Sequence, residues 1–255
     1  MHFQTFLSKI EPTDDQRVEV STAHDTLRSR LRADDFTEYF KGSFLSGSYG
    51  RGTAIRQTKT VDIIVVANYN RIFWEPHLSL FQLKRVLSKS FKTVIIQNNS
   101  IRIPLNLLDL SIIPAIIEEG SLKIPDRDAH NWVPSNVHRH IQLTTAMNES
   151  KKYLYKPLVK SLKCWRDQRL TEAWRPKSFL LECLVYDYAA NSTLDSIPKA
   201  IEGFLWYTHN KYKPFKESQK ASPIIREIGS KENNMAKSWA YTDFCNFMDE
   251  VYKSW

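Results

Sequence analysis

Segments with the pattern of β-strands fall in the first half of this chain, and the second half follows the spacing of helices. The run 61–67 is short, apolar and rich in β-branched residues, which is typical of a buried strand. Similar patterns predict strands at 93–97 and at 101–113, the second bent at Pro104. From residue 138 onward, apolar residues recur at helical spacing instead. This order predicts an α+β core followed by a helical lobe.

The spacing of apolar residues predicts two helices in the first half of the chain and several in the second. The first two are expected at 14–31 and 77–90. The later helices are expected at 140–155, 156–169, 178–190, 197–209 and 242–254. The segment 118–136 is rich in Pro, Asp and Asn and is expected to be a loop. The predicted domains are a core that includes the N-terminal helix, residues 1–137, and a helical second lobe, residues 138–255.

The charge of the chain favours polyanionic partners. Its 36 Lys and Arg residues exceed its 28 acidic residues, which gives a net charge of +8 and a pI of about 9.3. Nucleotides, nucleic acids and acidic membrane surfaces all fit this charge, which does not choose among them. The cysteines Cys164, Cys183 and Cys245 lack metal-ligand spacing, and their odd number fits a reducing cytosol. Without a signal-peptide pattern or an apolar run of roughly 20 residues, a cytoplasmic protein with no membrane insertion is expected.

A Gly-Ser turn precedes two apolar strands that each carry one isolated acid. The turn begins at Gly47 and Ser48, and such a turn can present backbone N–H groups to phosphate oxygens. Asp62 and Asp109 each lie in an otherwise apolar run, where a carboxylate is costly unless it is paired or binds a metal. Taken singly, these features indicate a plain turn and two salt bridges. Together they predict a site for Mg²⁺ and a nucleoside triphosphate.

The same residues carry a resemblance to a known family. The segment 44–55, with the sequence FLSGSYGRGTAI, resembles the signature of the polymerase-β-like nucleotidyltransferases. It is most similar to that of the bacterial cyclic-oligonucleotide synthases of anti-phage signalling, which are relatives of cyclic GMP-AMP synthase and oligoadenylate synthetase. The resemblance continues through 108–115, 124–127, Trp132, 135–136, 156–166 and 176–182, and more weakly through 233–239. Blocks in the expected order over most of the chain are more specific than any single block.

This resemblance implies a fold and roles for particular residues. The fold would be a polymerase-β-like core with a mixed β-sheet, packed on a C-terminal helical lobe that closes the active-site cleft. Asp62 and Asp109 would act in catalysis by binding Mg²⁺, or Mn²⁺ in its place. The residues that would bind the nucleotide are Gly47, Ser48, Lys163 and Ser178. Glu182 and Trp165 are expected to pair and pack rather than to catalyse.

One acid of the family's metal-binding set is missing. The family has two acids one residue apart on the first strand, whereas this strand offers only Asp62. In one register Asp62 is the second acid, and Thr60 occupies a catalytic position expected to be Asp. In the other register Asp62 is the first acid and Ile64 occupies the second position. We prefer the first register, because it leaves the apolar run 63–67 to complete a buried strand and matches the Lys-x-Val-Asp-Ile run of close relatives.

The missing acid bears on activity. Neither threonine nor isoleucine replaces a charged, bridging carboxylate, so we expect weakened metal affinity and a loss of roughly several kcal/mol of transition-state stabilisation. Three explanations follow. The chain is a natural relative with low or no activity, or it is a disabled variant of an active enzyme. In the third and least favoured explanation, Asp126 or Asp128 supplies the missing carboxylate.

The leading hypothesis is a Mg²⁺-dependent nucleotidyltransferase that makes cyclic or linear oligonucleotide second messengers. A ribose hydroxyl would attack the α-phosphate of a nucleoside triphosphate, and pyrophosphate would leave. The expected partners are nucleoside triphosphates, the oligonucleotide product and a downstream effector protein. Two alternatives stay open: a catalytically dead nucleotide-binding regulator, and a transferase that acts on RNA 3′ ends and needs an extended basic groove.

Overall fold

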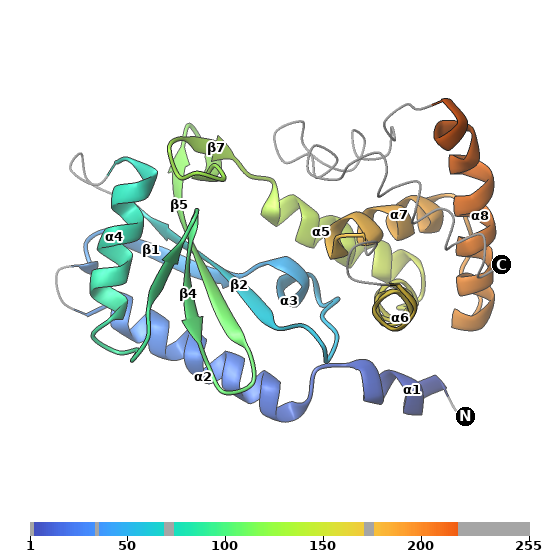
Figure 1. The fold of residues 1–255 in the computed structure, drawn as a ribbon, viewed down its shortest axis with the longest axis horizontal. Helices are drawn as coiled ribbons and strands as arrows, with labels where there is room; N and C mark the ends of the chain where they lie inside the picture. The colour runs from blue at the N-terminus through green and yellow to red at the C-terminus, as the bar shows by residue number, and fades with distance from the viewer. Residues whose placement is uncertain (1–2, 34–35, 69–73, 171–175, 219–255) are drawn as a thin grey trace. The chain divides into compact units, whose positions relative to one another are not determined.

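The computed structural model describes residues 3–33, 36–68, 74–170 and 176–218 (Figure 1). These residues divide into two compact units. The sheet unit comprises 12–50 and 56–137, and the helical unit comprises the described parts of 1–11, 51–55 and 138–255. After segment 51–55, the chain returns to the sheet unit and enters the helical unit again at residue 138. The described part of 1–11 and the short segment 51–55 belong to the helical unit, whereas the predicted N-terminal helix, 14–31, belongs to the sheet unit.

The sheet unit contains a mixed sheet, which has seven strands in the described part of the chain. The strands are β1 (Phe40–Leu45), β2 (Thr60–Ala67), β3 (Ile95–Gln97), β4 (Ser100–Pro104), β5 (Asp109–Glu118), β6 (Ser121–Pro125) and β7 (Trp132–Pro134). Five lie in the order β1-β2-β5-β4-β3, with β6 paired to β5 and β7 paired to β6. The β2–β5 pair is parallel and the other pairs are antiparallel. The predicted α+β fold with a mixed sheet is confirmed.

Two predictions about strands were wrong. The single bent strand expected at 101–113 is an antiparallel hairpin, in which β4 ends at Pro104 and β5 begins at Asp109. The turn between them is closed by a 2.9 Å hydrogen bond from the N–H of Leu105 to the carbonyl oxygen of Leu108. The loop expected at 118–136 contains β6 and β7, which both end at a proline. Proline marks the ends of these strands, where the missing N–H is tolerated, rather than an irregular segment.

Two helices pack on one face of the sheet (Figure 1). Helix α2 (Asp14–Leu31) has the predicted bounds. It starts with a capping box, in which the side chains of Thr13 and Gln16 each accept the other residue's backbone N–H. Helix α4 is Pro76–Leu87. The core that these helices form with the sheet includes Val20, Leu27, Leu31, Leu80, Leu83, Val61, Ile63, Leu110 and Ile112.

The helical unit contains α1 (Phe3–Ile10), α5 (Val137–Ser150), α6 (Tyr155–Arg169), α7 (Ser178–Ala190) and α8 (Ile197–Ser218). Most of α7 is buried, and its apolar residues join those of α6 and α8 in a second core. Trp165 packs against this core as expected. The helix expected at 242–254 and Cys245 lie outside the described residues. None of the described helices has both the length and the apolar character that crossing a membrane requires.

Candidate active site

The Gly-Ser turn forms the start of a short helix, α3 (Gly47–Arg51). The N–H of Ser46 donates a 2.7 Å hydrogen bond to the carbonyl oxygen of Asp62, and the N–H of Gly50 donates to the carbonyl oxygen of Ser46 at 2.8 Å. Ser48 lies in this helix and is half-buried. These bonds hold the turn against β2, the strand that carries Asp62.

Gly47 lies directly against the carboxylate of Asp62. Its φ of 56° is in the left-handed region, which glycine adopts without strain. A Cβ at this position would fall 2.2 Å from Oδ2 of Asp62, closer than any side chain can approach. The backbone conformation and the close contact therefore both require glycine, and the structure brings these two predicted site residues together.

Thr60, Asp62 and Asp109 lie on one face of the sheet, which we call the acid face. In the parallel pairing of β2 and β5, Thr60 is opposite Asp109 and Asp62 is opposite Ser111. Alternate residues of a strand share a face, so these four polar side chains form one polar area. The residues between them in the sequence are buried in the core beneath α2 and α4.

The environment changes along β2. Thr60 is exposed and Asp62 is half-buried. Ile64 is fully buried, in a small apolar cluster with Val66 and Ala115. A carboxylate at position 60 would stand at the surface opposite Asp109, whereas one at position 64 would lie among apolar side chains. The two candidate positions for the missing acid therefore differ sharply in the cost of holding a charge.

Asp109 is ion-paired to an arginine that the sequence analysis did not single out. Nε of Arg102 donates to Oδ2 of Asp109 at 2.7 Å. Arg102 lies on β4 opposite Ser111, so its side chain is also on the acid face. The signal in the sequence was the alternation of β4, in which Arg102 stands between the buried residues Ile101 and Ile103.

The acid face offers oxygen ligands of the kind that Mg²⁺ prefers. Mg²⁺ in proteins is commonly held by one or two carboxylates together with water and substrate phosphates. Asp62 and Asp109 provide two carboxylates on neighbouring strands. Within the described ranges, no group of three or more His, Cys, Asp or Glu side chains could hold a metal ion. The residues present thus fit one divalent ion shared with a phosphate ligand, not an ion held by three protein carboxylates.

Lys163 is fully buried, and its ammonium is engaged by three acceptors. Its Nζ donates to Oε1 of Glu182 at 2.7 Å, to the carbonyl oxygen of Thr53 at 3.0 Å and to Oγ1 of Thr53 at 3.3 Å. An ammonium has three N–H donors, so these contacts account for all of them. In this structure Lys163 belongs to an internal ion-pair network of the helical unit.

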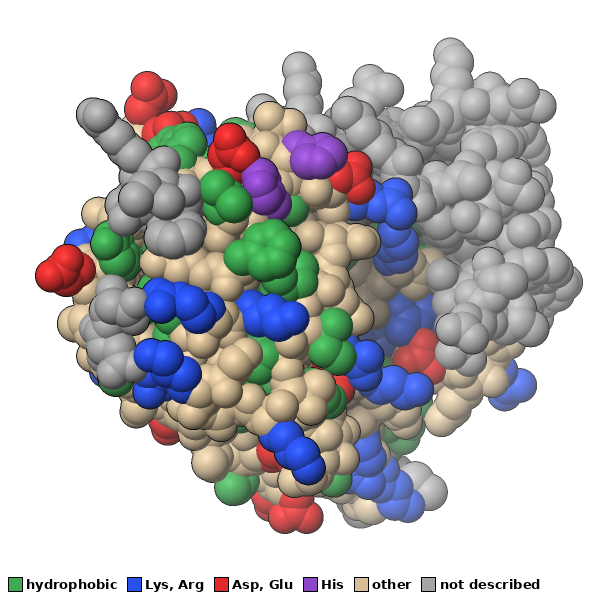
Figure 2. Space-filling view, turned by 60° about the vertical axis from the view of Figure 1, so that its left-hand side comes forward, with side chains coloured by type: hydrophobic (Ala, Val, Ile, Leu, Met, Phe, Trp, Pro, Cys, Tyr) green, Lys and Arg blue, Asp and Glu red, His purple; other side chains and the backbone are tan. Residues whose placement is uncertain are grey.

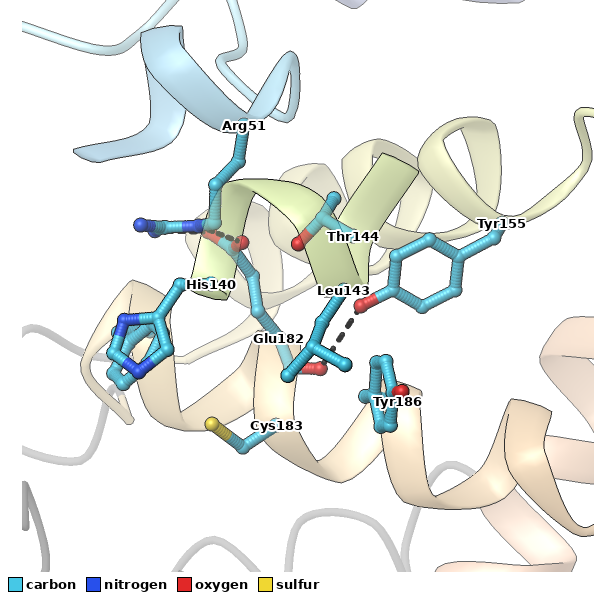
Figure 3. A pocket seen from close by; sticks show the side chains of 9 residues that line it. Arg51, His140, Leu143, Thr144, Tyr155, Glu182, Cys183 and Tyr186 are labelled. Carbon is cyan, nitrogen blue, oxygen red and sulfur yellow. Dashed lines mark hydrogen bonds and ion pairs between the residues drawn. The ribbon is translucent and has the colours of Figure 1, made fainter. Parts of the chain in front are cut away.

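Glu182 is the centre of this network, as its expected pairing role suggested. Arg51 donates to both of its carboxylate oxygens, from Nε at 2.7 Å and from the second guanidinium nitrogen at 3.0 Å (Figure 3). Burial acts to raise the pKa of the Glu182 carboxyl, but the charges of Lys163 and Arg51 outweigh it and hold that pKa below its ordinary value. We call Arg51, Lys163 and Glu182 the buried triad.

Beside the buried triad lies a cavity of about 20 Å³ (Figure 3). Its lining includes Arg51, His140, Tyr155 and Glu182. Such a volume holds about one water molecule. This cavity is therefore far too small for a nucleotide.

The other predicted residue of the helical unit, Ser178, is the first residue of α7. Its Oγ accepts a 2.9 Å hydrogen bond from Arg166, which also donates to the carbonyl oxygen of Pro176 at 3.0 Å. Ser178 and Lys163 thus belong to separate hydrogen-bond networks.

A second lysine of α6 lies against the glycine-rich segment. Gly52 has a φ of 69°, and a Cβ there would fall 3.2 Å from Nζ of Lys156. Burial, followed by the charge of Lys160, lowers the pKa of the Lys156 ammonium. Among the residues that the structure describes, no ion pair or hydrogen bond involves this ammonium. The sequence analysis did not identify Lys156.

Comparison with known proteins identifies the family. Residues 1–148 match the family described as the Second Messenger Oligonucleotide or Dinucleotide Synthetase domain. The chain is 30% identical to a cyclic AMP-AMP-AMP synthase of Acinetobacter sp., and the match covers 98% of this chain and 75% of that protein. It is 24% identical to a cyclic AMP-AMP-GMP synthase of Enterobacter hormaechei, with coverage of 98% and 82%.

Solved structures show the same fold. The E. coli MS115-1 CdnC structure with ATP matches with a TM-score of 0.74 at 18% identity, and covers 99% of this chain and 88% of that one. The Bradyrhizobium diazoefficiens CdnG structure in complex with GTP matches with a TM-score of 0.78 at 12% identity, with the same coverage. The family match spans more than half of the chain and agrees with the 30% identical relative. The chain therefore belongs to the second messenger oligonucleotide or dinucleotide synthetase family, which comprises bacterial nucleotidyltransferases that make cyclic oligonucleotides.

Proposed function

We propose that this chain binds ATP with Mg²⁺, or Mn²⁺, at the acid face and uses it to make a cyclic or linear oligoadenylate. The observation that carries the proposal is the placement of Asp62 and Asp109 on one face of two parallel strands, with Gly47 pressed against the Asp62 carboxylate. The preference for adenine rests on the relative described as a cyclic AMP-AMP-AMP synthase.

In the proposed reaction, a ribose hydroxyl attacks the α-phosphate of ATP. The bond between the α- and β-phosphates breaks, pyrophosphate leaves, and the hydroxyl proton is released. Asp62 and Asp109 would hold the divalent ion, which supplies activation of the hydroxyl and neutralises charge on the leaving group. The glycine at position 47 keeps the side of Asp62 that faces the turn free of a side chain, so that the N–H groups of α3 and the hydroxyl of Ser48 can approach a phosphate.

We also propose that Thr60 occupies the position of the missing acid. The pairing of Thr60 with Asp109 and its exposure support this register. The full burial of Ile64 in an apolar cluster speaks against the other one. A hydroxyl in place of a carboxylate weakens ion binding, so low catalytic activity is part of the proposal.

The roles proposed for Lys163 and Ser178 in binding the triphosphate need a local exchange of partners. Lys163 would have to give up a contact with Thr53 to donate to a phosphate oxygen, while its ion pair with Glu182 could remain. Ser178 accepts from Arg166 and still has its own hydroxyl proton to donate.

We further propose that the protein acts in the cytoplasm, in anti-phage signalling, and that its product acts on a downstream effector protein. The basic character of the chain suits a polyanionic substrate and product, and Figure 2 shows Lys and Arg side chains at several separate places on the visible face. One structural neighbour, E. coli CdnC, is described in a complex with HORMA-deltaN, which supports the expectation of a protein partner.

A nucleotide-binding regulator without catalysis is the second candidate function. The observation that favours it is the threonine at position 60. The transferase that acts on RNA 3′ ends is less favoured, because the curated relatives described above are both named for cyclic nucleotides.

Isothermal titration of the chain with ATP and Mg²⁺ tests the shared part of these proposals. The wild-type chain is expected to bind ATP, and an Asp62→Asn/Asp109→Asn double variant that remains folded is expected to bind it much more weakly. Failure of both the wild type and Thr60→Asp to bind any of the four ribonucleoside triphosphates would sink the proposed function.

A further inference from the structure

We propose that Arg102 supplies, at the acid face, the positive charge that a second divalent ion would otherwise bring, so that this chain binds its nucleotide with a single ion. Two-metal sites use two ions to stabilise the attacking and leaving oxygens. The inference rests on the proposed function and goes beyond it, because it names a further phosphate-binding residue and fixes the number of ions.

Position is the first argument. Arg102 projects from β4 onto the same face as Asp109 and Asp62, because it stands opposite Ser111 in the antiparallel pair. Its guanidinium already contacts one of the two acids, with Nε at 2.7 Å from Oδ2 of Asp109. The Arg102 guanidinium therefore occupies an oxygen of Asp109 that could otherwise bind a second divalent ion.

Charge balance is the second argument. Three carboxylates with two divalent ions leave one net positive charge to face the triphosphate. Two carboxylates, one guanidinium and one divalent ion leave the same net charge. With threonine at position 60, two ions beside Arg102 would leave three net positive charges on this small face, and their mutual repulsion would weaken the binding of the second ion.

The chemistry of the guanidinium is the third argument. It carries five N–H donors in a planar fork, and the hydrogen bond to Asp109 uses one of them. The remaining donors match phosphate oxygens, which arginine binds in a bidentate manner. The Arg102 side chain is 42% exposed, so a ligand can reach it. Asp109 would thus orient the Arg102 guanidinium toward phosphate and also supply an oxygen ligand to the single divalent ion.

Counting bound Mn²⁺ by electron paramagnetic resonance tests the inference without relying on catalysis. The probe is Mn²⁺ with the α,β-methylene analogue of ATP at saturation, corrected for Mn²⁺ held by the analogue alone. The wild type is expected to bind one Mn²⁺ per chain. The double variant Thr60→Asp/Arg102→Ala, which has the third carboxylate and lacks the cation, is expected to bind two.

Affinity for the analogue gives a second readout. Arg102→Ala should weaken binding at least about tenfold, because it removes charge-assisted hydrogen bonds to phosphate. Arg102→Lys keeps the charge but loses the planar fork of donors, so its affinity for the analogue should lie between those of the wild type and Arg102→Ala. Arg85→Ala is the matched control, since Arg85 is exposed on α4, which packs on the opposite face of the sheet. Circular dichroism melts establish that each variant is folded.

The outcomes separate this inference from the proposed function. Two Mn²⁺ per wild-type chain, or unchanged affinity in Arg102→Ala, would overturn the inference and leave the proposed function standing. No binding of analogue or Mn²⁺ by the wild type and by Thr60→Asp would overturn both. One ion in the wild type, two in the double variant and a loss of affinity specific to Arg102 would support it.

Discussion

Gly47 lies so close to Asp62 that a Cβ at position 47 would fall 2.2 Å from the carboxylate oxygen Oδ2. The first residue of the turn and the Asp62 carboxylate are therefore packed directly against each other. A backbone hydrogen bond from the N–H of Ser46 to the carbonyl oxygen of Asp62 also holds the turn against β2. Nucleotide binding at the acid face should therefore depend on this glycine as strongly as on the acid.

Gly47→Ala should displace the Asp62 carboxylate and abolish Mn²⁺ and ATP binding. Gly120→Ala is the matched control, because Gly120 also has a left-handed φ, of 76°, but has nothing within 4 Å of its Cβ position. The control should cost only the backbone strain, about 1 kcal/mol of the free energy of unfolding. Isothermal titration and urea unfolding measure both effects. Equal binding by the two variants would refute the role of the contact.

The two candidate positions for the missing acid should respond differently to aspartate. Thr60→Asp should change the free energy of unfolding by less than about 1 kcal/mol, because Thr60 is exposed. Ile64→Asp should cost at least about 3 kcal/mol, because it places a carboxylate in a fully buried apolar cluster. Urea unfolding of both variants checks this. If Ile64→Asp changed the free energy of unfolding as little as Thr60→Asp, the register that places the missing acid at position 64 would be favoured instead.

Two lysines of α6 offer a matched pair for the buried triad. Lys163→Met should destabilise the chain by about 3–5 kcal/mol, because it removes one of the two cations that compensate the buried Glu182. Lys156→Met removes the same charge from a half-buried lysine outside the triad and should cost less than about 1 kcal/mol. Chemical denaturation of the two variants measures the difference. Similar losses in both would show that the triad contributes little to stability.

Acid should weaken the buried triad. Because the pKa of Glu182 is lowered in the folded chain, its contribution to stability is complete above about 4.5, the ordinary value for Glu, and is lost as the pH falls through the lower folded value. The difference in unfolding free energy between the wild type and Glu182→Gln should therefore narrow as the pH drops below about 4.5. Urea titrations between pH 3 and pH 7 would measure it. A difference that is constant over this range would contradict the assignment.

Local signals in the sequence predicted much of the fold. The bounds of α2 were predicted from helical spacing, and the structure adds a capping box of Thr13 and Gln16 at its start. The isolated acids Asp62 and Asp109 were predicted to belong to one site, and the register of β2 and β5 places them on one face of the sheet. The hairpin between β4 and β5 was missed because Pro104 was interpreted as a bend within one strand, although it ends β4.

The long-range pairs of the site could not be predicted. Arg51 and Glu182 are 131 residues apart in the sequence, and no periodic pattern links them. Lys163 was expected to bind phosphate because of the family resemblance, and nothing in the local sequence indicated its ion pair with Glu182. Arg102 was missed because its significance depends on the strand register, which brings it beside Asp109.

The most direct test of the account compares the wild type, Thr60→Asp and Thr60→Asn for conversion of α-labelled ATP into phosphatase-resistant product with Mg²⁺ or Mn²⁺. Asparagine matches aspartate in size but lacks the charge that holds an ion. The account predicts abundant product from Thr60→Asp and little from the other two. Equal product from all three proteins, or background label from all three, would contradict it.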